Sequence, residues 1–136
     1  VISAPRGMLK SIDTNKYLSL SISDMIADSL KIYSTSRDIE LHNCRIDQLG
    51  IQNMYSFSLT DNCIVNQFYG AHSSGLSEYF GIKCSEDSKL GTVCIDSRNL
   101  STIDLSDANY SSVNIKNSDE NIKVVLNSDV VIRKAE

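Results

Sequence analysis

Hydrophobic residues recur along this chain in a pattern that repeats every 19 positions. The segment that begins at Leu20, LSISDMIADSLKI, aligns without a gap on the segment that begins at Ile39, IELHNCRIDQLGI. The aligned apolar pairs are Leu20 with Ile39, Ile22 with Leu41, Met25 with Cys44, Ala27 with Ile46, Leu30 with Leu49 and Ile32 with Ile51. A third copy begins at Phe57 with one inserted residue, and a fourth begins at Ile103. Such self-similarity at a fixed period is the signature of a repeat architecture.

Each copy consists of short alternating segments that are separated by two polar corners. The first corner holds Asp24, Asn43 and Asn62 in successive copies, and the second holds Asp28, Asp47 and Asn66. Three short strands per copy, stacked at a strand spacing of about 4.8 Å, predict a β-solenoid. We therefore expect an all-β chain that forms a right-handed parallel β-solenoid, with rungs of about 19 residues and an irregular C-terminal part.

The repeat also predicts which residues stack on one another inside the coil. Two inward apolar columns are expected, one of Met25, Cys44 and Cys63 and one of Leu30, Leu49 and Phe68. The corner residues should form polar ladders, whose amide members can donate hydrogen bonds from rung to rung. An antiparallel sandwich of short strands is the alternative interpretation. A helix over residues 21–33 is disfavoured, because the counterpart segment contains Asn, Cys and Gly, which suit a helix poorly.

The chain divides into segments of one expected domain, 1–136. The expected segments are a lead-in or cap at 1–19, three regular rungs at 20–70, a loop-rich insertion at 71–102 that contains strands at 79–84 and 92–96, and a further rung with terminal strands at 103–136. The terminal strands are expected to serve as a cap, an edge or a contact with another subunit. Because the chain begins at Val1, we expect it to be a piece of a longer protein.

Composition supports a β protein and excludes some partners. The chain has one Pro, six Gly and no Trp, and its many Ser, Asn and Asp residues suit short strands with frequent corners. A net charge of −4 argues against a nucleic-acid partner. No apolar run approaches the roughly 18 residues of a membrane span, so we expect no membrane insertion.

The four cysteines do not have the spacing of a metal site. No CxxC pair occurs, and Cys44 and Cys63 are separated by the repeat period. A disulfide between these two is geometrically possible in the stacked arrangement, but we expect reduced, buried thiols that pack as small apolar groups. The redox states of Cys84 and Cys94 stay open. We expect no metal, no cofactor and assembly in a reducing cytosol.

Two further groups of polar residues are candidates for chemistry. His42 and His72 have no evident partner and are interpreted as loop or corner residues. Asp28 and Asp47 should lie one rung apart, and a carboxyl pair about 5 Å apart would suit a retaining glycosidase. A corner-forming role explains the same pair, because Asn66 occupies the equivalent position of the next rung.

Outward-facing residues predict a shallow ligand-binding groove. The candidate ligand-binding residues are Tyr33, Glu40, Arg45, Tyr55 and Tyr69, with Lys31 nearby. Aromatic faces with flanking polar groups hold sugars by stacking on their apolar faces and by hydrogen bonds to their hydroxyls.

The stretch from Leu20 to Gly70, with short strands rich in Ser, Asn and Ile and with Cys above Cys, resembles the parallel β-helix domains of bacteriophage tailspikes and tail fibres. The resemblance implies a homotrimer on the virion tail or surface, assembled in the host cytoplasm, that binds a bacterial surface polysaccharide. It carries no catalytic motif over to this chain. We therefore expect a non-catalytic binding or assembly domain, and a polysaccharide-degrading glycosidase is the alternative.

A second resemblance concerns the segment SLKIYSTSRDIEL at 29–41, which looks like a rung of the β-helix of cyclase-associated protein and tubulin cofactor C. It implies a cytoskeletal regulator. The glutamine-arginine signature of that family is absent from the sequence, and residues 71–136 depart from its regular rungs. Whether the rungs come from one chain or are interleaved among three stays open at this stage.

Overall fold

The computed structural model describes residues 11–14, 19–34, 38–52, 56–71, 79–98, 100–117, 122–127 and 132–135. These residues form strands and no helix. The strands are β1 (Ser11–Thr14), β2 (Leu20–Ser23), β3 (Ile26–Ser34), β4 (Asp38–His42), β5 (Arg45–Gln52), β6 (Ser56–Thr60), β7 (Ile64–Ala71), β8 (Tyr79–Cys84), β9 (Lys89–Asp96), β10 (Thr102–Asp107), β11 (Tyr110–Lys116), β12 (Lys123–Leu126) and β13 (Ile132–Ala135).

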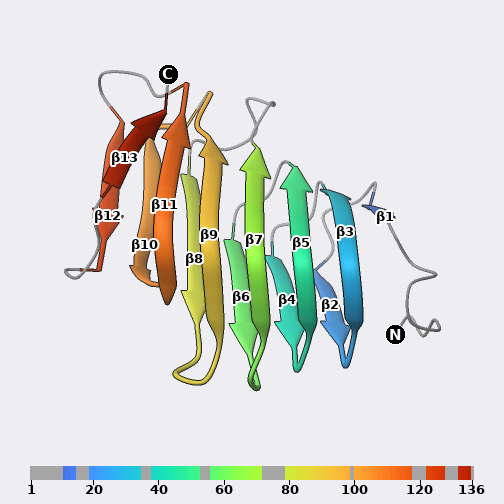
Figure 1. The fold of residues 1–136 in the computed structure, drawn as a ribbon. Helices are drawn as coiled ribbons and strands as arrows, with labels where there is room; N and C mark the ends of the chain where they lie inside the picture. Colours follow the sequence, from blue (N-terminus) through green and yellow to red (C-terminus); the bar gives the residue numbers. More distant parts are fainter. Residues whose placement is uncertain are drawn as a thin grey trace.

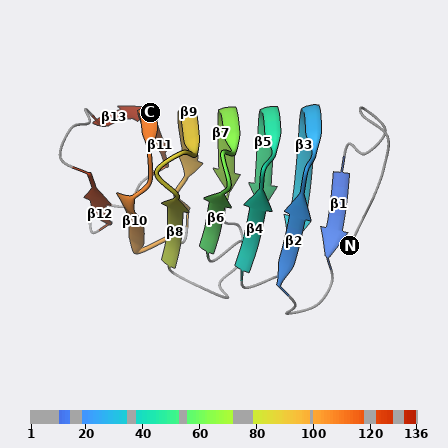
Figure 2. The ribbon, with the colours of Figure 1, turned by 90° about the horizontal axis from the view of Figure 1, so that it is seen from below.

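The strands form two parallel sheets that face each other (Figures 1 and 2). Sheet A has the order β1-β3-β5-β7-β9-β11-β13, and sheet B has the order β12-β10-β8-β6-β4-β2. The chain therefore alternates between the sheets, so that each turn adds one strand to both. In Figure 1 it runs up through sheet A in front and down through sheet B behind, while it advances from right to left, which makes the coil right-handed. The predicted fold class is confirmed, and right-handed crossovers are the rule for parallel strands.

The predicted register is confirmed in both sheets. Leu20 pairs with Ile39 in sheet B, and Leu30 pairs with Leu49 in sheet A. Inward apolar residues therefore stack directly on their counterparts from the next rung, as the offset of 19 requires. Consecutive segments of one chain supply each of these rungs.

Each turn contains two strands and not the three that we expected. The second corner is a bend inside a continuous strand: in β5, Ile46 and Leu49 are buried, whereas Asp47 and Gln48 between them are both exposed. Two successive outward residues break the alternation, and β3, β7 and β11 break it at the equivalent place. Because every rung bends at the same position, the ladder resumes after the bend and no separate third strand forms.

The segment 71–102, expected to be a loop-rich insertion, contains a regular rung in its described part. Strand β8 has the predicted bounds, while β9 begins at Lys89 and not at Thr92. The rung is in register, with Phe57 beside Ile82 and Phe68 beside Val93. Both pairs have an offset of 25 residues and not 19, so the extra residues enter the chain before β8, between Ala71 and Tyr79, and the corner that follows β8 does not change the offset.

Three phenylalanine rings pack against one another inside the coil. The ring of Phe68 stacks on that of Phe57 at a centroid distance of 5.2 Å and meets Phe80 edge-on at 6.3 Å. The column of Leu30, Leu49 and Phe68 is buried as predicted. In the other predicted column, Cys44 and Cys63 are fully buried and Met25 is partly buried.

The corners follow the predicted polar ladders. Asp24, Asn43 and Asn62 each adopt a positive φ, of 60°, 52° and 63°, which Asn and Asp tolerate better than other non-glycine residues. The side-chain amide of Asn43 donates a hydrogen bond of 2.8 Å to the carboxylate of Asp24.

The described terminal segments extend the solenoid as edge strands. Strand β1, within the predicted lead-in, pairs with β3 and buries Ile12. Strands β12 and β13 pair with β10 and β11, so both terminal strands expected after Ile115 continue the coil.

Candidate functional site

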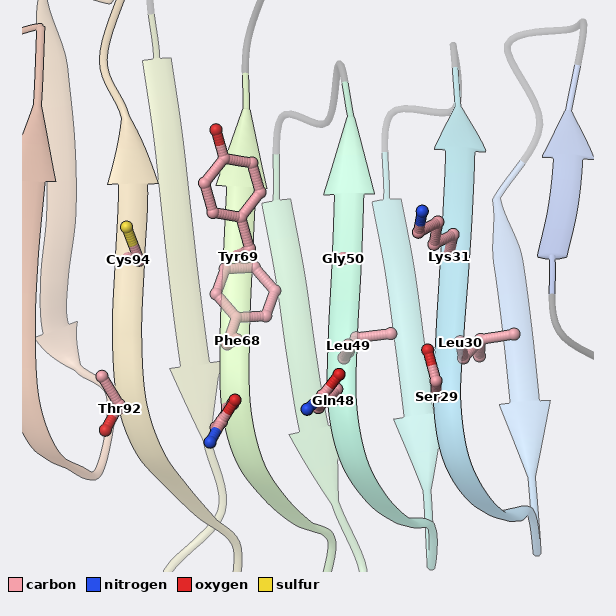
Figure 3. A pocket seen from close by; sticks show the side chains of 11 residues that line it. Ser29, Leu30, Lys31, Gln48, Leu49, Gly50, Phe68, Tyr69, Thr92 and Cys94 are labelled. Atoms are coloured by element: carbon pink, nitrogen blue, oxygen red, sulfur yellow. The ribbon is translucent and has the colours of Figure 1, made fainter.

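A shallow groove of about 580 Å³ lies on the outer face of sheet A, across β3, β5, β7 and β9 (Figure 3). Its position follows from the strand alternation, because residues between the inward columns of sheet A must point away from the core. Across these four strands the groove spans about 14 Å at the usual strand spacing. This length suits an extended ligand better than a single small molecule.

One side of the groove is a row of neutral hydrogen-bonding side chains. The row consists of Ser29, Gln48, Gln67 and Thr92, which are register partners on successive strands. The two glutamines occupy equivalent positions of neighbouring rungs, so their amides lie side by side. Each amide has a donor and an acceptor, so it can bind a ligand hydroxyl that accepts a hydrogen bond or one that donates it.

The second row lies two residues further along the strands and consists of Lys31, Gly50, Tyr69 and Cys94. Gly50 therefore leaves an opening between the Lys31 and Tyr69 side chains (Figure 3). Tyr69 is 42% exposed, and the Lys116 ammonium lies 5.6 Å from its ring centroid. This cation–π contact holds one side of the ring and orients it on the sheet.

The charged side chain in the described lining of the groove is positive. Its lining includes Lys31 and no carboxylate. The nearest acidic neighbours along the chain, Asp28 and Asp47, belong to the bend and are outside the lining. In a chain with a net charge of −4, a groove without carboxylates differs from the average surface.

The structure brings together only part of the predicted ligand-binding set. Tyr69 lies in the groove, and Tyr33 is exposed near the end of β3, outside the lining. Arg45 begins β5 and is also outside the lining, while Glu40 lies on β4 in sheet B. Tyr55 lies outside the described residues.

Sequence reasoning missed the amide row and the opening. Gln48 and Gln67 recur at the repeat period, which is a signal for a shared function. Gly50 interrupts an otherwise regular strand, which is a second signal, because glycine inside a strand often marks the close approach of a ligand.

The two candidate catalytic carboxylates lie on neighbouring strands, as predicted. Asp28 and Asp47 flank the bend between the register pairs Ala27–Ile46 and Ser29–Gln48, and both are exposed. The carboxylate of Asp47 accepts a hydrogen bond of 3.0 Å from the side-chain amide of Asn66. These contacts fit a corner ladder.

His42, which has no evident partner in sequence, has three in the structure. Its Nδ1 lies 2.6 Å from the Thr60 hydroxyl and 3.5 Å from the Asp61 carboxylate, and its Nε2 lies 3.3 Å from Glu40. A hydroxyl, an imidazole and a carboxylate in sequence resemble a nucleophilic triad. However, His42 and Thr60 are register partners on neighbouring strands at a corner, and neither lines the groove. The contacts therefore fit side-chain hydrogen bonding between adjacent rungs. His72 lies outside the described residues.

All four cysteines are free thiols. Cys44 and Cys63 are buried, as predicted, and the backbone N–H of Cys44 donates a hydrogen bond of 3.1 Å to the Cys63 sulfur. The contact between their sulfurs, together with burial, raises the pKa of Cys44 above its ordinary value. Burial also raises the pKa of Cys84, whereas Cys94 lines the groove.

Within the described residues, no group of His, Cys, Asp or Glu side chains is arranged to hold a metal ion. No helix long and apolar enough to cross a membrane is found in the described part of the chain.

Comparison of the chain with protein-family models, curated proteins and solved structures gave no match. The chemistry of the groove is therefore the basis on which a function can be inferred.

Proposed function

We propose that this chain is a non-catalytic binding domain that holds a polysaccharide in the groove on sheet A. The observation that carries the proposal is the position of Tyr69, an exposed and oriented aromatic ring, two residues beyond the glutamine row on the same strands. A sugar ring has an apolar face that stacks on tyrosine and hydroxyl groups that reach the amides. Successive sugars of a linear polymer would then lie across successive strands.

The proposal excludes turnover for a structural reason. A glycosidase needs its acid and its nucleophile on either side of the bound glycosidic bond. Asp28 and Asp47 lie at the bend and outside the groove lining, and Asn66 hydrogen-bonds to Asp47. We therefore expect the bound polymer to remain intact.

The test compares two tyrosines of equal exposure on opposite sheets. Tyr69 on β7 is 42% exposed and Tyr79 on β8 is 41% exposed. In calorimetric titrations with a panel of acidic and neutral polysaccharides, Tyr69→Ala should weaken binding by about fivefold or more, because an aromatic stacking contact contributes about 1 kcal/mol beyond its buried area. Tyr79→Ala should leave the affinity unchanged. Equal losses in the two variants, or no binding by the unaltered chain, would contradict the proposal.

A reducing-end assay on the same mixtures tests the absence of turnover. We expect no new reducing ends. If reducing ends form and Asp47→Asn abolishes them while binding persists, the chain is a glycosidase.

The proposed setting is a trimeric, fibre-like surface protein of a virion, which the resemblance to tailspike domains supports. The edge strands β1 and β13 each pair on one side only among the described strands, which leaves backbone groups that another chain can use. Light scattering should give a mass of about three times 15.1 kDa. A mass of one chain would overturn the trimer and leave the binding function to be judged by the tyrosine variants.

A further inference from the structure

Gly50 differs from the other glycines of the described strands. An added Cβ would lie 2.9 Å from the Phe80 ring at Gly70, 2.5 Å from the Tyr79 hydroxyl at Gly81 and 2.2 Å from a backbone oxygen at Gly91. At Gly50 its nearest neighbours, the Cγ of Lys31 and the backbone oxygen of Tyr69, would lie 4.0 Å away. The packing of the coil thus does not require glycine at this position.

Glycine weakens a strand, because it has no side chain to pack and loses more conformational entropy than other residues on folding. At position 50 that weakness has no compensation within the described fold. The register is unbroken at Gly50, so it marks no bulge, and a glycine inside a regular strand is typical of a place where a ligand or another backbone approaches closely. The position lies in the groove, between Lys31 and Tyr69.

The charged residues around the opening favour a negatively charged ligand. Lys31 borders it on one side, and Tyr69, with the Lys116 ammonium 5.6 Å from its ring centroid, borders it on the other. The described lining contains no carboxylate that would neutralise the Lys31 ammonium. An anionic group seated over Gly50 would meet the Lys31 ammonium without a competing acid, and charge-assisted hydrogen bonds are stronger than neutral ones.

We propose that the opening at Gly50 receives the carboxylate of an acidic polysaccharide, with Lys31 as its partner and a sugar ring stacked on Tyr69. This inference rests on the proposed binding function and deepens it by naming the substrate class. The Gln48 and Gln67 amides would hold hydroxyls of the same polymer, and the carboxylate would fix its register on the sheet.

The experiment uses pairs of probes that have the same sugars and differ at the carboxyl group. Oligogalacturonate and hyaluronan oligosaccharides are titrated into the full chain beside their carboxyl methyl esters, which keep the hydroxyls and remove the charge. The variant is Lys31→Met, which keeps the apolar stem, and the matched control is Lys83→Met at an exposed position of β8 on sheet B. We expect at least one acid to bind more tightly than its ester. Lys31→Met should weaken the acid about tenfold and leave the ester unchanged, since one charged hydrogen bond is removed.

The outcomes separate this inference from the function on which it rests. Esters that bind as tightly as acids, or an equal effect of Lys31→Met and Lys83→Met, would overturn the acidic ligand. If Tyr69→Ala still weakens binding in that case, the polysaccharide function stands. If none of these probes and no other member of the panel binds the unaltered chain, both proposals fail.

Discussion

The side-chain amide of Asn66 donates a hydrogen bond of 3.0 Å to the carboxylate of Asp47, one rung earlier in the coil. The same relation joins Asn43 to Asp24 at the other corner, at 2.8 Å. In both places an amide follows a carboxylate at an offset of 19, so a donor meets an acceptor from one rung to the next. At these two pairs the order of Asp and Asn adds a hydrogen bond between rungs to the tolerance of both residues for turns.

The order of amide and carboxylate leads to the first prediction. Asn66→Asp places a second carboxylate beside Asp47, and like charges directly opposite each other on neighbouring strands are destabilising. We expect the free energy of unfolding to fall by about 1 kcal/mol at neutral pH and low salt, and the loss to shrink at high salt because exposed charges are screened. Urea unfolding at both salt concentrations measures it. Asn66→Ser, which adds no charge, is the control, and an equal, salt-independent loss in both variants would contradict the explanation.

A buried carboxylate at the end of β9 makes stability depend on pH. The side chain of Asp96 is only 6% exposed, and its oxygens accept hydrogen bonds from the Arg98 guanidinium at 3.1 and 2.7 Å and from the Asn117 amide at 3.2 Å. The Arg98 hydrogen bonds lower the pKa of Asp96 below its ordinary value, against the effect of burial. Ionised Asp96 therefore stabilises the fold above the unfolded-state pKa of about 4, and this contribution is lost as the pH falls through the lower folded-state pKa.

The second prediction uses this carboxylate. Asp96→Asn should lower the free energy of unfolding by about 2 kcal/mol at pH 7, because hydrogen bonds to a charged group are replaced by weaker neutral ones. The difference in the free energy of unfolding between the variant and the unaltered chain should narrow as the pH falls below about 4 and through the lower folded-state pKa, because Asp96 then loses its charge. Urea unfolding as a function of pH measures both effects. Asp107→Asn, at an exposed position of β10, is the control, and a difference for Asp96→Asn that stays constant with pH would contradict the assignment.

The residues that face the core made the fold predictable. Leu30 and Leu49 must both be apolar to stack inside the coil, so the repeat records their register. The bend at Asp47 and Gln48 was harder to interpret, because two polar residues in succession suit a corner between strands and a bend within one equally well.

The groove was less predictable, for a physical reason. Outward positions such as Lys31, Gly50 and Tyr69 are register partners, yet the core places no constraint on them and they share no residue type. Tyr69 was identified by its aromatic character. Its neighbour Gly50 has no chemistry of its own, and its meaning appears only when the space around it is known.

The third prediction concerns the space beside Gly50. Filling it should stabilise the fold and weaken ligand binding. Gly50→Ala should raise the free energy of unfolding by about 0.5–1 kcal/mol, because alanine in a strand interior loses less entropy than glycine and its Cβ would come no closer than 4.0 Å to any neighbouring atom. The same methyl group occupies the opening, so the affinity for an acidic oligosaccharide should fall. Gln52→Ala, on the same strand but outside the groove lining, should leave the affinity unchanged.

Gly91 is the control for the Gly50 substitution, because the packing of the coil requires glycine at position 91. An added Cβ there would lie 2.2 Å from the backbone oxygen of Asn66, so Gly91→Ala must displace the neighbouring strand and should destabilise the fold. Thermal unfolding of the two variants should therefore shift in opposite directions. If Gly50→Ala also destabilised the chain, glycine at this position would be a requirement of the fold. If it stabilised the chain and left binding intact, the opening would be empty in the complex, and the ligand would lie elsewhere on the sheet.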